Sequence, residues 1–90
     1  MKKAFQATVK GKVQGVWFRK YTRDKALELG IQGIVKNQPD GTVYVEAEGE
    51  PEKLELFKAW LHEGSPMSQV DEVEIREIPV KNYETFEIIY

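Results

Sequence analysis

The sequence changes twice from a strand pattern to a helix pattern, and this repeated order is the strongest constraint on its fold. Apolar residues at alternate positions predict strands near residues 4–12, 31–37, 43–47, 70–78 and 86–90. Between them, apolar residues at helical spacing predict helices over residues 19–29 and 51–63. The predicted order is strand, helix, strand, strand, helix, strand, followed by a short strand at the end.

Each predicted helix has a single apolar stripe and ends at a glycine. The first stripe consists of Phe18, Tyr21, Thr22, Ala26 and Leu29, before Gly30. The second consists of Leu54, Phe57 and Leu61, with Trp60 beside it, before Gly64. Two helices cannot cover both faces of a four-stranded sheet, so both are expected on one face.

This order predicts an α+β fold of the ferredoxin-like split βαβ type. We expect an antiparallel sheet in which the third strand lies between the first and the second, with two helices on one face. The other face is expected to be open to water, and the series Glu46, Glu48, Glu50 and Glu52 to be exposed. With 90 residues, the chain is predicted to be a single domain, residues 1–90.

The composition excludes several classes of site. The chain has no cysteine and one histidine, His62, so thiol nucleophiles, disulfides and multi-histidine metal sites are ruled out. We see no apolar run long enough to cross a bilayer and no signal peptide, so we expect a cytoplasmic protein that binds no membrane. A pI near 5.4 and the lack of an aromatic RNP1-like run argue against nucleic-acid binding.

The charges are unevenly distributed along the chain. Residues 1–45 hold nine Lys or Arg and three Asp or Glu, whereas residues 46–90 hold four and twelve. Either an anion binds near the N-terminal half, or the charges cluster by chance.

The loop that enters the first helix has the residues of an anion site. A helix N-terminus presents unpaired N–H groups and a partial positive charge, so it can bind a phosphate. Gly15 permits a tight backbone path, and the guanidinium of Arg19 can bind two phosphate oxygens at once. The loop is neither a Walker A loop nor a dinucleotide fingerprint. On these residues alone, a phosphate site and a plain connection both remain open.

Two stretches of the sequence resemble the signatures of the acylphosphatase family. The stretch GKVQGVWFR, Gly11 to Arg19, is similar to the first signature, and GIVKNQPDGTV, Gly33 to Val43, to the second. Both occur in the family's order and at its separation. The stretches Gly64-Ser65-Pro66 and Phe86-Glu87-Ile88 also fit, so the resemblance covers essentially the whole chain.

The resemblance implies an enzyme that hydrolyses acyl phosphates to a carboxylate and inorganic phosphate, with no cofactor and no metal. It implies that the phosphoryl group is held by a backbone cradle of Gln14, Gly15, Val16, Trp17, Phe18 and Arg19, together with the guanidinium of Arg19. Asn37, also by resemblance, positions the attacking water. Trp17 flanks the cradle and is expected to wall or cover the site. The substrate and the phosphate product are the only partners implied, and the oligomeric state stays open.

One alternative keeps the same loop but has no catalysis. A non-catalytic domain that senses phosphate or another anion would use Arg19 and the cradle. Such a domain has no use for an amide that positions water, so Asn37 separates the two hypotheses.

Overall fold

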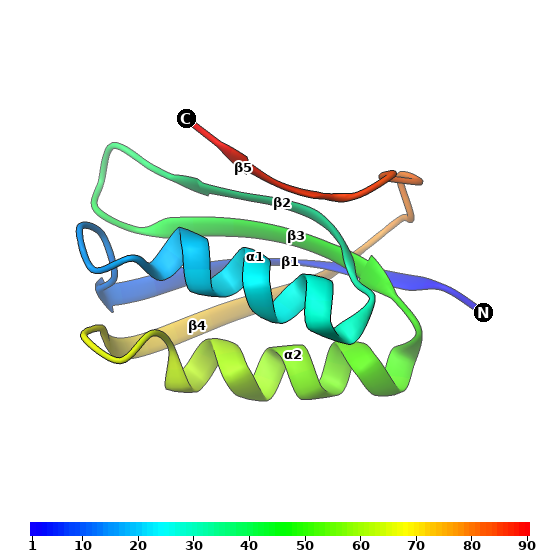
Figure 1. Ribbon diagram of the computed structural model, residues 1–90, viewed down its shortest axis with the longest axis horizontal. Coiled ribbons are helices and arrows are strands. Elements are labelled where there is room, and N and C mark those ends of the chain that lie inside the picture. The colour runs from blue at the N-terminus through cyan, green and yellow to red at the C-terminus, as the bar shows by residue number, and fades with distance from the viewer.

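Five strands form one sheet in the order β4-β1-β3-β2-β5, in a computed structural model that describes all 90 residues. The elements are β1 (Lys3–Lys12), α1 (Phe18–Leu29), β2 (Gln32–Asn37), β3 (Val43–Gly49), α2 (Pro51–Glu63), β4 (Gln69–Ile78) and β5 (Phe86–Ile89). The predicted α+β fold is confirmed, with β3 between β1 and β2. Both helices lie on the same face of the sheet (Figure 1).

Alternation along the strands produces the core under the helices. Phe5, Ala7 and Val9 of β1 are buried, as are Val43 and Val45 of β3. Each helix contributes its predicted stripe, with Phe18, Thr22 and Ala26 buried on α1 and Leu54, Phe57 and Leu61 on α2. Tyr21, predicted on the first stripe, is 42% exposed, so the buried stripe of α1 is narrower than the sequence suggested.

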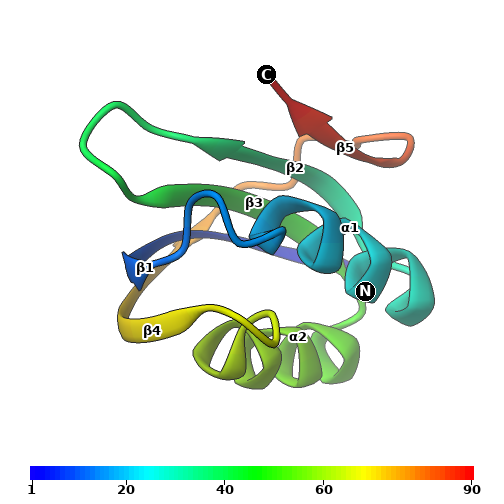
Figure 2. The same cartoon turned by 60° about the vertical axis from the view of Figure 1, so that its left-hand side comes forward.

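The pairing of the strands decides where the functional loops meet. β1 and β2 both pair antiparallel with β3, so β1 and β2 run parallel to one another. Their carboxyl ends therefore lie at the same end of the sheet. The β1–α1 loop and the β2–β3 hairpin meet at that end (Figures 1 and 2).

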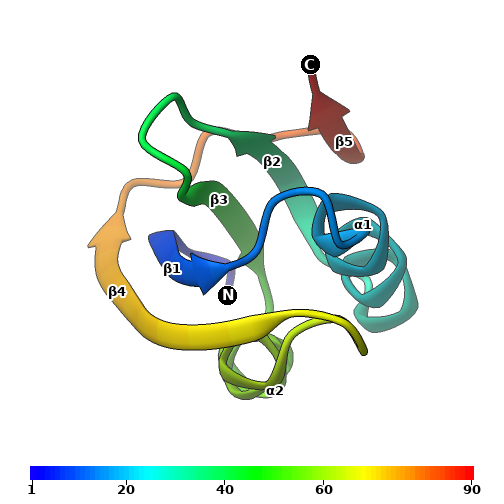
Figure 3. The ribbon, with the colours of Figure 1, turned by 90° about the vertical axis from the view of Figure 1, so that its left-hand side faces the viewer.

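The fifth strand makes the sheet mixed. The first four strands pair antiparallel, as predicted, whereas β5 pairs parallel with β2. Because β4 and β5 lie at opposite edges, residues 79–85 have to cross the sheet between them. They cross the face opposite the helices (Figure 3).

This crossing corrects the prediction that Glu46 and Glu48 are exposed. Glu46 is 6% exposed and Glu48 only 1%, because the crossing segment lies over them. Glu50 and Glu52 are exposed, as expected. The face that was predicted to be open to water is therefore partly covered. Neither helix is both long enough and apolar enough to pass through a membrane.

Candidate active site

The β1–α1 loop turns some of its residues into the core and others toward a pocket. Val13, Val16 and Phe18 are buried in the core and fix the loop in place. Gly15 and Trp17 have positive φ angles of 74° and 63°. These two left-handed residues turn the backbone tightly before α1 begins, which is the geometry of an anion-binding nest.

The backbone N–H groups of this loop find no acceptor in the main chain. Residues 13–17 lie in neither helix nor strand, and no backbone hydrogen bond outside the regular elements uses an N–H of residues 14–19. The first such bond at this end of α1 runs from the N–H of Tyr21 to the carbonyl of Trp17, at 3.1 Å. Donors that the fold leaves unpaired at a helix start are available to a bound anion.

Two side chains tie this loop to its neighbours. The Ser65 hydroxyl donates to the carbonyl of Val16 at 2.9 Å. The side-chain amide of Gln14 donates to the carbonyls of Gln38 and Thr42 at 2.8 and 2.9 Å. The sequence indicated only a backbone role for Gln14 and no role for Ser65. Their functions depend on contacts between distant parts of the chain, and no local pattern signals them.

Arg19 lies in the first turn of α1 and forms no ion pair, since no carboxylate oxygen comes within 4.0 Å of its side-chain nitrogens. Its guanidinium carbon lies 5.0 Å from the centre of the Tyr90 ring, a cation–π contact. The guanidinium therefore keeps its charge unneutralised inside a pocket of about 510 Å³. The pocket is lined by Val13, Gly15, Trp17, Phe18, Arg19, Lys20, Arg23, Asn37, Ile88 and Tyr90.

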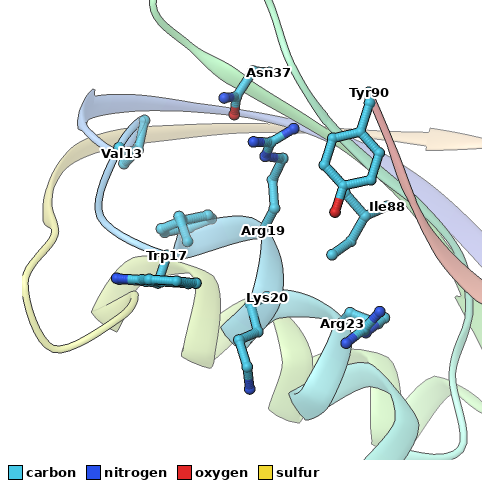
Figure 4. A pocket seen from close by; sticks show the side chains of 10 residues that line it. Val13, Trp17, Arg19, Lys20, Arg23, Asn37, Ile88 and Tyr90 are labelled. Atoms are coloured by element: carbon cyan, nitrogen blue, oxygen red, sulfur yellow. The ribbon is translucent and has the colours of Figure 1, made fainter.

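Asn37 is the last residue of β2 and lines the same pocket. Its Oδ1 is buried and accepts no hydrogen bond from the protein. Leaving a buried acceptor unpaired costs about 1–3 kcal/mol, so such an atom is suited to a partner from outside the chain. Its side chain and that of Arg19 lie toward one another in the pocket (Figure 4). The structure thus brings the predicted site residues together from β2 and α1.

The hairpin that follows Asn37 is held by its own side chains. Thr42 donates to Asp40 Oδ1 from both its N–H, at 3.0 Å, and its hydroxyl, at 2.6 Å. These two hydrogen bonds lower the pKa of Asp40 below its usual value. Asp40 is therefore an ionised turn residue, in agreement with the predicted hairpin role.

The C-terminal strand contributes residues that sequence reasoning did not assign to the site. Ile88 and Tyr90 line the pocket opposite the loop, and Arg23 lines it one turn after Arg19. The parallel pairing of β5 with β2 brings these C-terminal residues to the site. Only the position of β5 in the sheet could have indicated them.

The comparisons with known proteins point to one family. The family model described as acylphosphatase matches residues 5–88. An acylphosphatase of Archaeoglobus fulgidus is 47% identical over 97% of this chain and 98% of its own length. The structure of an acylphosphatase from Coxiella burnetii superposes with a TM-score of 0.95 at 41% identity, covering 98% of this chain and 93% of that one. That of an acylphosphatase from Bacillus subtilis has a TM-score of 0.95 at 34% identity, and the whole of both chains is covered.

Proposed function

This chain belongs to the acylphosphatase family and is a hydrolase that acts on acyl phosphates, and we propose that the pocket beside α1 is where it does so. In the proposed reaction, a water molecule attacks phosphorus in line with the carboxylate leaving group. The products are a carboxylate and inorganic phosphate. The run of unpaired N–H groups that ends at an unneutralised Arg19 is the observation that carries this proposal.

The phosphoryl group binds in the cradle formed by residues 14–19. Its oxygens accept hydrogen bonds from the backbone N–H groups, while the Arg19 guanidinium stabilises their negative charge. Phosphoryl transfer leaves little covalent work for a protein, so positioning and charge stabilisation dominate the catalysis. The oriented N–H groups need no reorganisation when charge develops on the equatorial oxygens.

The attacking water binds at Asn37. Its buried Oδ1 accepts a hydrogen bond from the water and holds the water's lone pair toward phosphorus. The end-of-strand position of Asn37 makes this geometry rigid, because the side chain extends from a hydrogen-bonded ladder and from a hairpin tied by Thr42. A water held in this way starts close to its attacking geometry.

This site works without a general acid. The leaving group is a carboxylate whose conjugate acid has a pKa of about 4 to 5, so it departs as a stable anion near neutral pH. A phosphoryl oxygen of the substrate takes the proton of the attacking water. No metal ion enters the proposed reaction, and we expect activity to survive EDTA.

The test is the hydrolysis of benzoyl phosphate by the purified protein and by Asn37→Ala. The substitution removes the group that orients water, and we expect a fall in kcat of about 10²-fold or more. It leaves the cradle intact, so the inhibition constant of inorganic phosphate is expected to stay within about twofold. Gln32→Ala, an amide removed at the other end of β2, is the matched control and is expected to leave both quantities unchanged.

A normal kcat in Asn37→Ala would disprove the role of Asn37. Failure of the unaltered protein to hydrolyse any acyl phosphate, with inorganic phosphate still bound, would instead support the anion-sensing alternative. The acylphosphatase relatives, which match over nearly the whole chain, favour the enzyme.

A further inference from the structure

Trp17 occupies a position that ordinary conformational preferences disfavour. It precedes α1 as the N-cap residue, with φ of 63°, and its side chain makes no capping hydrogen bond. Ser, Thr, Asp or Asn would supply a capping oxygen there, and Gly or Asn would adopt the left-handed conformation with less strain. Trp17 is also 69% exposed, so it adds little to the core. Neither capping nor burial accounts for tryptophan here.

A second left-handed residue shows how unusual this choice is. Asn82 is the other non-glycine residue with positive φ, at 62°, and asparagine is among the residue types that adopt this conformation readily. A bulky residue held there is strained, and such strain clusters at functional sites. The outlier at Trp17 therefore points to a task for its side chain at the pocket.

The position of the indole indicates that task. Trp17 lines the pocket on the loop side, while Ile88 and the 95% exposed Tyr90 line it on the side of β5. Figure 4 shows the Arg19 guanidinium between the loop that carries Trp17 and the ring of Tyr90. The pocket therefore has a cationic centre and apolar walls at its mouth.

The two other cations that line the pocket lie near one carboxylate, that of Asp24. Lys20 Nζ lies 2.8 Å from Asp24 Oδ2, and Arg23 Nε lies 3.8 Å from Asp24 Oδ1. Because both share one carboxylate of the protein, they offer less charge to the substrate than Arg19 does.

We propose that Trp17 is a specificity residue that contacts the acyl group of the substrate and favours aromatic over small acyl groups. This inference rests on the proposed function, because the phosphoryl group in the cradle fixes which end of the substrate reaches the mouth. An acyl phosphate consists of a charged phosphoryl end and an acyl group that can be apolar. The pocket presents Arg19 to the first and the aromatic rings of Trp17 and Tyr90 to the second. Contact between an aromatic ring and the exposed indole of Trp17 is worth about 1 kcal/mol, or about fivefold in kcat/KM.

The experiment compares benzoyl phosphate with acetyl phosphate in Trp17→Gly. Glycine keeps the backbone N–H and the left-handed conformation, so in the folded protein the substitution removes the indole and leaves the donor in place. The quantity measured is the ratio of the two kcat/KM values, in which any effect on the shared cradle cancels. We expect the preference for benzoyl phosphate to fall about fivefold, and Trp17→Phe to restore most of it.

Tyr21→Ala is the matched control, since Tyr21 is an exposed aromatic residue of α1 that does not line this pocket. It should change neither the activity nor the ratio. An unchanged ratio in Trp17→Gly would overturn the inference, as would a preference of the unaltered protein for succinyl phosphate, whose acyl group carries a charge.

A binding measurement separates this inference from the proposed reaction. Benzylphosphonate and methylphosphonate share the anionic end, and neither is hydrolysed. We expect benzylphosphonate to bind the unaltered protein more tightly, and Trp17→Gly to remove the difference. Equal binding of the two phosphonates to the unaltered protein would overturn the inference even if acyl phosphates are hydrolysed. If the unaltered protein hydrolyses no acyl phosphate but still binds benzylphosphonate more tightly than methylphosphonate, the proposed reaction is wrong and the role of Trp17 stands.

Discussion

Two places in this molecule present consecutive backbone N–H groups, of which one set binds a carboxylate of the chain and the other is proposed to bind a phosphoryl group. One is the cradle of residues 14–19, and the other is the crossing segment, where Lys81, Asn82 and Tyr83 donate their N–H groups to Glu48 at 2.8, 3.2 and 2.5 Å. Each contains one of the two left-handed residues that are not glycine, Trp17 and Asn82. The backbone uses the same device in both places.

The two places differ in the source of the anion. Glu48 is 1% exposed and supplies its own carboxylate to the crossing segment, so those donors hold the fold together. Beside it, Glu46 accepts hydrogen bonds from Lys81, Tyr44 and Tyr83. The cradle has no carboxylate from the chain within reach of Arg19. The crossing segment is satisfied by a carboxylate of the chain and contributes stability. The cradle is left open by the chain, and its proposed contribution is the binding of an external anion.

The sharpest way to break this comparison is Arg19→Ala. It removes charge from the cradle, and we expect kcat/KM to fall by about 10³-fold, as when a positioned arginine is lost from a phosphoryl-transfer site. The free energy of unfolding should fall by less than about 1 kcal/mol, because Arg19 has no ion pair to lose and only a cation–π contact with the exposed Tyr90 ring. Activity assays and urea titrations measure the two effects.

Inorganic phosphate gives a second measure of this substitution. It should raise the Tm of the unaltered protein and leave that of Arg19→Ala unchanged, because only a ligand that binds the folded state stabilises it. Arg76→Ala, on the exposed side of β4, is the control with the same change of charge. A large loss of stability in Arg19→Ala would contradict the division between the two nests.

Glu48→Ala should have the opposite profile. It leaves three N–H groups without their buried acceptor, and we expect the free energy of unfolding to fall by about 3 kcal/mol. The inhibition constant of phosphate should be preserved at a temperature where the variant is folded. Glu50→Ala, at an exposed carboxylate close by, is expected to cost less than about 0.5 kcal/mol. Equal stability of the two variants would show that the crossing segment does not need its nest.

The pH dependence of stability should come from the internal cluster. Burial opposes the ionisation of Glu46, but hydrogen bonds from Lys81, Tyr44 and Tyr83 outweigh it and lower the pKa of Glu46. Ionised Glu46 therefore contributes to the free energy of unfolding at pH values above its ordinary pKa. This contribution is lost as the pH falls through the lower pKa that Glu46 has in the folded protein. Burial and the hydrogen bond to Glu46 raise the pKa of Tyr83 from 10.0 to about 12.

Tyr83 has a raised pKa in the folded protein, so its protonated hydroxyl contributes to the free energy of unfolding below pH 10.0. This contribution is lost as the pH rises toward about 12. Urea unfolding across a pH series should therefore show stability declining at both ends. Glu46→Gln should flatten the acid part of this profile and leave the effect of phosphate on Tm at neutral pH unchanged. An acid profile identical to that of the unaltered protein would contradict the assignment.

The smallest expected effect concerns the two left-handed residues. Trp17→Gly relieves strain but makes the unfolded chain more flexible, and we expect a net gain of about 0.5 kcal/mol in the free energy of unfolding. Asn82→Gly relieves little strain, so the same entropy cost should make it neutral or slightly destabilising. Thermal or urea unfolding of both variants measures the difference. A more stable Asn82→Gly than Trp17→Gly would refute the claim that Trp17 is strained.

The fold could be predicted because local patterns and packing rules agreed. Alternation at Phe5, Ala7 and Val9 and the stripe ending at Gly30 define elements that can bury their apolar sides in few ways. The burial of Glu46 and Glu48 could not be predicted in this way, because alternation assigns them only to the face opposite the helices. What covers that face depends on the path from β4 to β5, and this path follows from the whole topology.

Only the part of the candidate site that lies in continuous stretches of sequence could be predicted. Arg19, Asn37 and the cradle lie in two continuous stretches, so motifs could indicate them, and the structure brings them to one pocket. Their catalytic roles, the single-domain organisation and the cytoplasmic location stay predictions. The ties made by Gln14 and Ser65, and the wall formed by Ile88 and Tyr90, arise from residues distant in sequence, and no single stretch encodes them.

The side-chain amide of Gln14 has a consequence for how the reaction geometry is set. It joins the β1–α1 loop to the carbonyls of Gln38 and Thr42, in the hairpin after Asn37. The spacing between the two halves of the site therefore depends on the length of one side chain that touches no reacting atom. In the proposed reaction, variation at this position would tune the alignment of the attacking water with phosphorus without changing Asn37 or Arg19.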